Sequence, residues 1–256
     1  MSHRVLYVPA GDLGPVMVFG PDGSRLPPVG EPGTRSICVC DRDAKGTLFF
    51  ASRGGSVNVF DVASAEVRQK IPQRDCFGLA ALVDHGVVAV SAHSEGGFKV
   101  LRASDGVVLH TVKVPGGSFY CAGDPLSATF YIGKGPSPCS VSAFKWQPAE
   151  GRDSGAIAPL GIVAGAGSTG NCRPMAVVPP APGLRTAYLL VGTIWSSELR
   201  VVSLPDHALV HTHDLKGLSV TGLAADPTGT AIAVCDKALR AVHVLSWPLP
   251  GMPALT

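Results

Sequence analysis

Short runs of β-branched and aromatic residues recur along the chain, and each run is followed by a polar turn. The six runs are centred on Val18-Phe19, Val59-Phe60, Val100-Leu101, Ala143-Phe144, Val201-Val202 and Val244-Leu245. Successive runs are 41, 41, 43, 58 and 43 residues apart. Self-similarity at a fixed period is the signature of a repeat architecture, so this spacing constrains the fold more than any other feature of the sequence.

Each repeat contains enough short apolar segments for four strands. A small-residue segment and a second apolar segment precede each run, and a returning strand follows it, as in FDVASAEV (60–67) and SLPDHALV (203–210). Asp, Gly, Ser and Pro between these segments supply turn conformations. The pattern predicts an all-β chain: a β-propeller of about six blades, each a four-stranded antiparallel sheet with its small-residue strand innermost.

The predicted blades cover the chain as a single domain and show two irregularities. Their boundaries are about 1–32, 33–74, 75–115, 116–170, 171–216 and 217–256. The fourth blade carries the excess length, which we assign to a mobile Gly/Ala/Ser-rich insertion at 147–172. The first blade lacks its inner strand, and the last barely reaches a fourth, so either the first blade is three-stranded or the chain is part of a longer protein or assembly. An incomplete blade would leave an open sheet edge.

Composition indicates a neutral, intracellular protein. The formal net charge is +2, which favours neither nucleic acid nor an anionic membrane as the default partner. The seven cysteines form no CxxC pair, as expected of thiols in a reducing compartment. No apolar stretch is long enough to span a bilayer, and the first residues lack a signal-peptide core. We therefore expect a cytoplasmic, non-secreted protein.

Two segments resemble known propeller repeats. VMVFGPDGSRLPPVG (16–30) is similar to the end of an NHL unit, and VNVFDVASAEVRQKIP (57–72) is similar to the YVTN pattern. WD40-like repeats fit less well, because no Gly-His or Trp-Asp pair occurs; kelch repeats would explain the glycine doublets at 54–55, 96–97 and 116–117 but have a longer period. The NHL/YVTN resemblance implies a scaffold that presents loops, most often to proteins, sometimes to RNA, and in lactonase-like relatives to a small substrate.

The motif at 165–170, Gly-Ala-Gly-Ser-Thr-Gly, is a literal GxGxxG. A dinucleotide site needs this motif to open a helix whose first amides hold the pyrophosphate, with a carboxylate about twenty residues further on. Here Asn171-Cys172-Arg173-Pro174 and another strand follow, and 188–194 holds no carboxylate. We interpret the motif as a flexible loop between blades and predict no cofactor.

Other reactive residues also have a simpler interpretation. His211 and His213 lie on one face of an outer strand, where they are expected to be exposed, and we predict no metal. Cys38 and Cys40 serve as small apolar residues on an inner strand. Asp153-Ser154-Gly155 lies in a polar linker without a nearby histidine. No catalytic residue is assigned.

We therefore predict a non-catalytic interaction scaffold that binds protein partners through its rim loops. Trp146 and Trp195 are the aromatic anchors expected to touch a partner. A lactonase-like or hydrolase-like enzyme with a channel metal is the first alternative, and its metal would need loop carboxylates to turn inward, such as Asp41, Asp84, Asp124, Asp226 and Asp236. An RNA-binding NHL-like propeller is the second. Basic residues between Arg35 and Arg74, with Phe77 beside them, are its only support.

Overall fold

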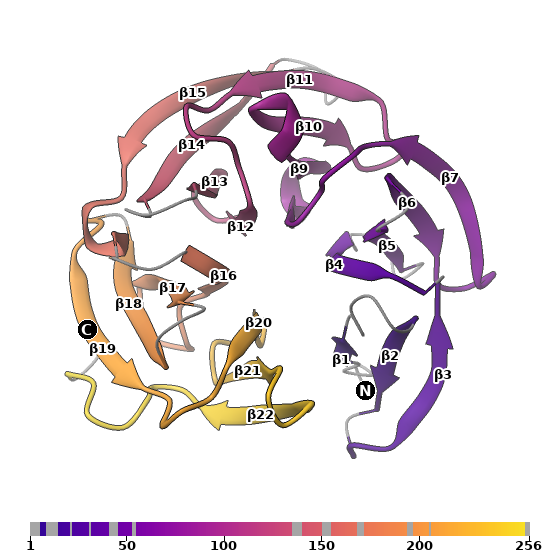
Figure 1. The fold of residues 1–256 in the computed structure, drawn as a ribbon. Coiled ribbons are helices and arrows are strands. Elements are labelled where there is room, and N and C mark those ends of the chain that lie inside the picture. Colours follow the sequence, from indigo (N-terminus) through magenta and orange to yellow (C-terminus); the bar gives the residue numbers. More distant parts are fainter. Residues whose placement is uncertain are drawn as a thin grey trace. The chain divides into compact units, whose positions relative to one another are not determined.

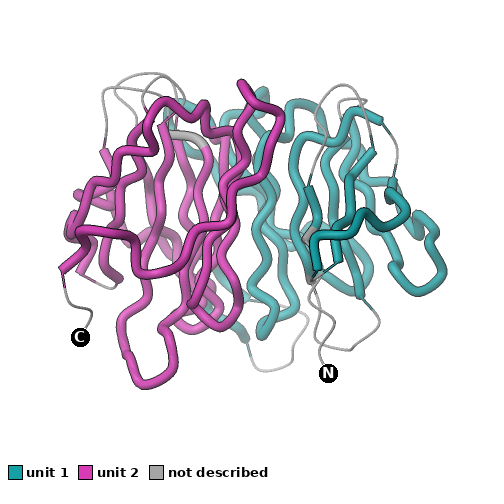
Figure 2. Tube along the Cα trace, turned by 90° about the horizontal axis from the view of Figure 1, so that it is seen from below, with its two compact units in different colours: residues 1–117, 147–156 teal, residues 118–146, 157–256 magenta. Residues whose placement is uncertain are grey.

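The chain folds as a β-propeller of six antiparallel sheets, as the repeat predicted (Figure 1). The computed structural model describes residues 6–8, 15–20, 22–30, 32–40, 46–52, 55–134, 140–149, 155–167, 172–193, 197–204 and 206–253. The described elements are β-strands and three short 3-10 helices. Contacts divide the chain into two compact units, residues 1–117 with 147–156 and residues 118–146 with 157–256 (Figure 2).

Unit 1 contains three sheets, each formed by strands that are consecutive in sequence. The first sheet has three described strands, in agreement with the predicted absence of an inner strand, and the other two have four. Its elements are β1 (Leu6–Val8), β2 (Val16–Phe19), β3 (Arg25–Val29); β4 (Thr34–Cys40), β5 (Thr47–Ser52), β6 (Ser56–Asp61), β7 (Glu66–Pro72); β8 (Leu79–Leu82), η2 (Val83–His85), β9 (Val87–Ala92), η3 (His93–Glu95), β10 (Gly97–Arg102) and β11 (Val108–Lys113).

Unit 2 contains the other three sheets, although the tip of the β14–β15 hairpin is grouped with unit 1. Two of these sheets have four strands and the last has three among the described residues. Its elements are β12 (Tyr120–Asp124), β13 (Thr129–Lys134), β14 (Ser140–Pro148), β15 (Gly155–Ile162), η4 (Ala164–Ala166); β16 (Cys172–Val178), β17 (Ala187–Thr193), β18 (Glu198–Leu204), β19 (Leu209–Asp214); β20 (Val220–Ala225), β21 (Ala231–Asp236) and β22 (Ala241–Ser246).

The six recurrent runs lie on equivalent strands: the third strand in five sheets and, in the first sheet, β2, the middle of its three described strands. Each pairs with the preceding strand in uninterrupted antiparallel register, for example Val59 with Phe49 and Val201 with Leu190. In the second to fifth sheets the side chains of these runs are buried, because successive sheets of a unit pack face to face. Val59 thus joins one cluster with Leu79 and Val88 of the following sheet. The period seen in the sequence is therefore the period of this packing.

The segment 147–172 is not simply an insertion, and this prediction needs correction. It contains β15, the eight-residue outer strand of the fourth sheet, followed by η4. The strand escaped prediction because Gly155, Pro159 and Gly161 weaken its β pattern and no charged residue marks a solvent face. Part of the extra length lies in long strands, since β14 has nine residues and β15 eight.

Candidate functional site

The loops at one end of the second and third sheets of unit 1 form a compact polar surface. Strand direction alternates along an antiparallel sheet, so the β7–β8 loop, η3 and the segment after β11 reach the same end. Backbone hydrogen bonds join them: His93 N donates to Asp75 O at 3.4 Å, and Val114 N donates to Gly96 O at 2.9 Å. We call this surface the η3 site and define it by Arg35, Gln73, Arg74, Phe77, His93, Glu95, Lys99 and Lys113.

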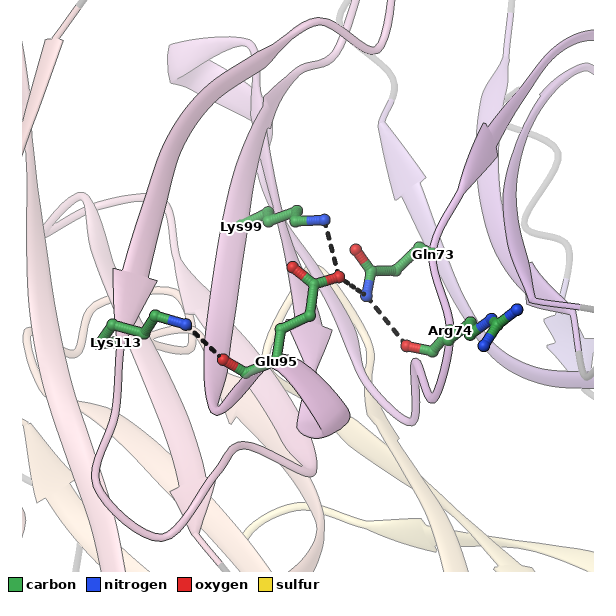
Figure 3. A network of polar contacts seen from close by, with 5 residues as sticks. All are labelled: Gln73, Arg74, Glu95, Lys99 and Lys113. Atoms are coloured by element: carbon green, nitrogen blue, oxygen red, sulfur yellow. Dashed lines mark hydrogen bonds and ion pairs between the residues drawn. The ribbon is translucent and has the colours of Figure 1, made fainter.

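Glu95, the last residue of η3, is the centre of a polar network in this site (Figure 3). Its Oε1 accepts hydrogen bonds from Lys99 Nζ at 2.9 Å and from Gln73 Nε2 at 3.2 Å. Its backbone carbonyl accepts a third from Lys113 Nζ at 2.7 Å. The Gln73 amide also donates to the carbonyl of Arg74 at 2.9 Å. One residue thereby links η3 to β10, β11 and the β7–β8 loop through its side chain and its backbone carbonyl.

The network favours the ionised form of Glu95. The hydrogen bond from Lys99 is the largest cause that lowers the pKa of this carboxyl; the charge of Lys99, the Gln73 hydrogen bond and the charge of Lys113 add to it, and partial burial opposes them. Glu95 and Asp75 are the carboxylates of these loops, against the cations of Arg35, Arg74, Lys99 and Lys113. The surface is therefore cationic on balance.

An arginine–aromatic–histidine stack lies in the same loops. The guanidinium carbon of Arg35, from the start of β4, lies 5.0 Å from the centroid of the Phe77 ring. The Phe77 ring in turn meets the His93 ring edge-on, with centroids 6.0 Å apart. All three side chains are half-buried, so each keeps part of its surface in solvent. A planar cation over an aromatic face is an arrangement that both stabilises loops and contacts ligands.

The buried shell beneath the stack holds the loop in place. Ser91 Oγ accepts hydrogen bonds from Phe77 N at 2.8 Å and Gly78 N at 2.9 Å, and Leu79 N donates to Ser36 Oγ at 3.1 Å. Cys76 is buried beside them, and burial raises the pKa of its thiol to about 12. This cysteine is therefore a packing residue rather than a nucleophile.

The histidine of the stack depends on a glycine for space. A Cβ at Gly117 would lie 2.8 Å from His93 Nδ1, and Gly117 itself has a φ of +76°. Gly96, which ends η3, has a φ of +70° and is likewise left-handed. The glycine doublets at 96–97 and 116–117 are thus the feature of the sequence that marks this site. From the sequence alone they indicate turns, but they do not show that these turns position His93 and Glu95.

The predicted aromatic anchors do not form the candidate site. Trp146, near the end of β14, is only 2% exposed, so its indole belongs to the core and the structure does not place it on a surface open to a partner. The alternation of side chains along β14 turns this residue inward. Trp195 lies outside the described residues, as does the Asp153-Ser154 segment.

The GxGxxG motif has a packing role in its described part, and the prediction of a flexible loop is corrected there. Gly165 is in the three-residue η4, and its N–H donates to His207 O at 3.0 Å. A Cβ at Gly165 would lie 2.4 Å from Leu209 N. The first glycine therefore allows η4 to touch the backbone beside β19, and no dinucleotide-binding helix follows in the described part of the motif.

His211 and His213 are not exposed on a rim, contrary to expectation. Their rings lie 5.9 Å apart on β19, and both are half-buried. The chain after β22 covers them: Gly251 approaches His211, and the Pro250 carbonyl accepts a hydrogen bond from His213. Burial, followed by the neighbouring His211, lowers the pKa of His213. The pair is part of a packing contact.

Several carboxylates considered for a channel metal stabilise turns instead. Asp124 accepts from Leu126 N and Ser127 Oγ, Asp226 accepts from Thr230 Oγ1, and Asp236 accepts from Ser219 N and Ala238 N. Asp41 lies outside the described residues. Across the described ranges, no group of three or more His, Cys, Asp or Glu side chains is arranged to hold a metal ion. None of the helices in these ranges is long and apolar enough to cross a membrane.

Comparisons with known proteins identify the fold and nothing finer. No family model matches the chain, and no curated protein matches its sequence. By contrast, 1359 chains of solved structures match it, so the fold is too widespread to select a function. One of them is Kuenenia stuttgartiensis hydrazine synthase, which is 14% identical with a TM-score of 0.57 over 84% of this chain and 77% of that chain. At that identity the likeness extends to the fold alone: the chain is a β-propeller.

Proposed function

We propose that this chain is a non-catalytic, cytoplasmic interaction scaffold of the NHL/YVTN-like kind, and that it binds a protein partner through the loops of the η3 site. The observation that carries the proposal is the stack of Arg35 on Phe77 and His93. These three side chains come from three separate segments and remain half-exposed, although a purely structural stack would gain more by full burial.

The composition around the stack also supports a protein partner. Arginine and aromatic residues are the types most enriched where binding energy concentrates in protein interfaces. Exposed Arg74 and Lys113 flank the stack and can form a polar rim. The Glu95 network holds the loops in one conformation before a partner arrives, which lowers the entropic cost of binding.

RNA binding is the second candidate, because cations beside an exposed aromatic ring also suit stacked bases and phosphates. Two features favour a protein partner over RNA. The Glu95 and Asp75 carboxylates lie within the same loops and would repel phosphates, and Phe77 is the single aromatic residue of the η3 site. A filter-binding assay with single-stranded RNA at low salt tests this candidate, and saturable binding lost in Phe77→Ala would favour RNA over protein.

A peptide-display selection tests the protein-binding role directly. The purified chain is the target, and the double variant Arg35→Ala/Phe77→Ala serves for counter-selection; Arg102→Ala, a surface arginine paired with Asp105 outside the site, is the matched control. We expect enriched peptides that bind the wild type and Arg102→Ala but bind the double variant at least about tenfold more weakly. Peptides that bind all three proteins equally would refute the site. No enriched peptide at all would refute the scaffold role through these loops.

A further inference from the structure

Among the described residues, β22 ends its sheet without a fourth strand. The order of this sheet is β20-β21-β22 in the described part of the chain, whereas the equivalent strands β2, β6, β10, β14 and β18 all pair with a following strand. In the second, third and fifth sheets that pairing shifts register at one equivalent place, the recurrent run itself: Val59/Phe60, Val100/Leu101 and Val201/Val202. Val244-Leu245 is the corresponding pair of β22. The strand therefore carries the same recurrent run at which the fourth strand pairs in the second, third and fifth sheets.

The alternation of the β21–β22 ladder identifies the groups on the open edge. Trp247 N donates to Thr230 O at 2.9 Å. From this pair onward, residue pairs with and without mutual hydrogen bonds alternate along the antiparallel ladder. Residues that exchange hydrogen bonds with β21 are therefore those at odd positions in β22. The backbone groups of Val242, Val244 and Ser246 point to the opposite, outer edge.

The described segment that follows β22, residues 247–253, does not return to fill this edge, because its apolar residues are buried elsewhere. Trp247 and Leu249 are 7% and 3% exposed and belong to a cluster with Leu199, Val201 and Leu215 of the fifth sheet. The Trp247 ring lies 5.5 Å from that of Tyr188. In Figure 1 the yellow chain accordingly leaves β22 and runs to the outside of β19.

The edge also lacks the features with which proteins discourage strand pairing. β22 reads Ala-Val-His-Val-Leu-Ser, with no Lys, Arg, Asp, Glu or Pro, and Val244 is 68% exposed. Natural sheets usually protect such an edge with charge, proline or a covering segment. The outer strands that cover the equivalent edges, such as β7 and β11, do carry charges on their own exposed side.

We propose that the outer edge of β22 binds an extended segment of another protein as the missing fourth strand. The fifth sheet shows what that segment must be, because Val201-Val202-Ser203 of β18 corresponds to Val244-Leu245-Ser246 and pairs with β19. The occupant is an antiparallel strand of about six residues. It has a branched apolar side chain at the position of Val210 and polar side chains toward solvent. Backbone hydrogen bonds provide the affinity and the alternating side chains the specificity.

The probe is a labelled synthetic peptide of residues 207–215, His-Ala-Leu-Val-His-Thr-His-Asp-Leu, titrated with the full chain and followed by fluorescence anisotropy. We expect saturable binding. Val244→Pro removes an outward N–H and leaves the bonds to β21 intact, so it should weaken binding at least about tenfold. Val244→Thr keeps the N–H and the branched shape, so it should change binding less than about twofold. If the proline variant does not fold, Val242→Pro replaces it, because that N–H also points outward.

Each result decides the proposal. Loss of binding in the proline variant, together with its retention in the threonine variant, supports strand addition. Peptide that fails to bind, or that binds the proline variant as well as the wild type, overturns it. Sedimentation of the chain alone tests the other occupant: a dimer that Val244→Pro converts to monomer would show that a second copy covers the edge, which also overturns the proposal. The η3 site lies in unit 1, so its variants should leave this peptide's binding unchanged.

Discussion

Replacing Gly165 with alanine should destabilise the second unit through a backbone clash. The added Cβ would lie 2.4 Å from Leu209 N, 2.9 Å from the Ala208 carbonyl carbon and 3.0 Å from His207 O. All three are backbone atoms, so no side chain can rotate away. Ordinary contact begins at 3.4 Å, and η4 must therefore move off β19 by about 1 Å.

The cost of that movement has two parts. Overpacking of this kind costs about 1–3 kcal/mol. The displacement also stretches the hydrogen bond from Gly165 N to His207 O, now 3.0 Å, which contributes about 0.5–1.5 kcal/mol. We expect a loss of roughly 2–4 kcal/mol in the free energy of unfolding, and a thermal midpoint lower by roughly 5–12 °C.

Urea unfolding followed by tryptophan fluorescence measures this loss, and a second glycine provides the control. Gly217→Ala adds a Cβ that meets nothing within 4 Å but has a φ of +86°, so it costs backbone strain alone, about 1 kcal/mol. If Gly165→Ala costs no more than Gly217→Ala, the packing role is wrong. If 165–170 held a dinucleotide, NAD would raise the midpoint of the wild type; we expect no shift.

Three further perturbations test the packing and charges described above. Trp247→Ala removes a side chain that is 7% exposed and should lower the free energy of unfolding by about 3–5 kcal/mol. Amide hydrogens of 247–253 should then exchange earlier than those of β19. Equal exchange in both segments would contradict the docking of 247–253. Cys76 should resist thiol reagents at pH 8 in the native chain, because burial raises its pKa to about 12, and mass-spectrometric mapping before unfolding would reveal any modification. Because the pKa of Glu95 is lowered in the folded chain, its ionised carboxylate contributes to the free energy of unfolding above the ordinary glutamate pKa. This contribution is lost as the pH falls through the pKa of Glu95 in the folded state. Below about pH 4.3 Glu95→Gln should therefore approach the wild type in stability, and above it should be less stable by under about 1 kcal/mol, since the carboxylate is 41% exposed. Urea midpoints from pH 3 to pH 7 check the sign, and a difference that grows on acidification would refute it.

The sequence predicted the sheets well because their determinants are local. The row that contains Val59, Val100 and Val201 repeats at the period of the blades, and small residues such as Ala80 and Ala176 occupy the neighbouring first strands. Strand β15 was missed because one proline and two glycines interrupt its alternation, although pairing with β14 still orders it. Tertiary pairing outweighed local preference there.

The candidate site was less predictable because its residues are distant in sequence. Arg35 and Phe77 are 42 positions apart, which is one repeat period, so they occupy equivalent places in neighbouring sheets. The period alone does not show that these two side chains meet each other and His93. Their meeting depends on β4 and β8 being neighbours, fixed by the bond from Leu79 N to Ser36 Oγ. The polar loops thus become one surface only once the repeat has folded.

The same comparison explains why β22 has an open edge. In the fifth sheet the chain turns at 206–208 and returns as β19, whereas after β22 the first residue is a tryptophan. Burial of that ring against Tyr188, with Leu249 beside it, is worth more than a fourth strand of a few backbone bonds exposed to water. One aromatic residue at position 247 therefore decides both where the following segment lies and which sheet keeps a free edge. Trp247→Ala should consequently do more than destabilise: the released segment would compete for β22, and binding of the 207–215 peptide would weaken. If peptide binding instead stayed unchanged while the segment was shown to be free, the segment would lack the ability to form a fourth strand at all.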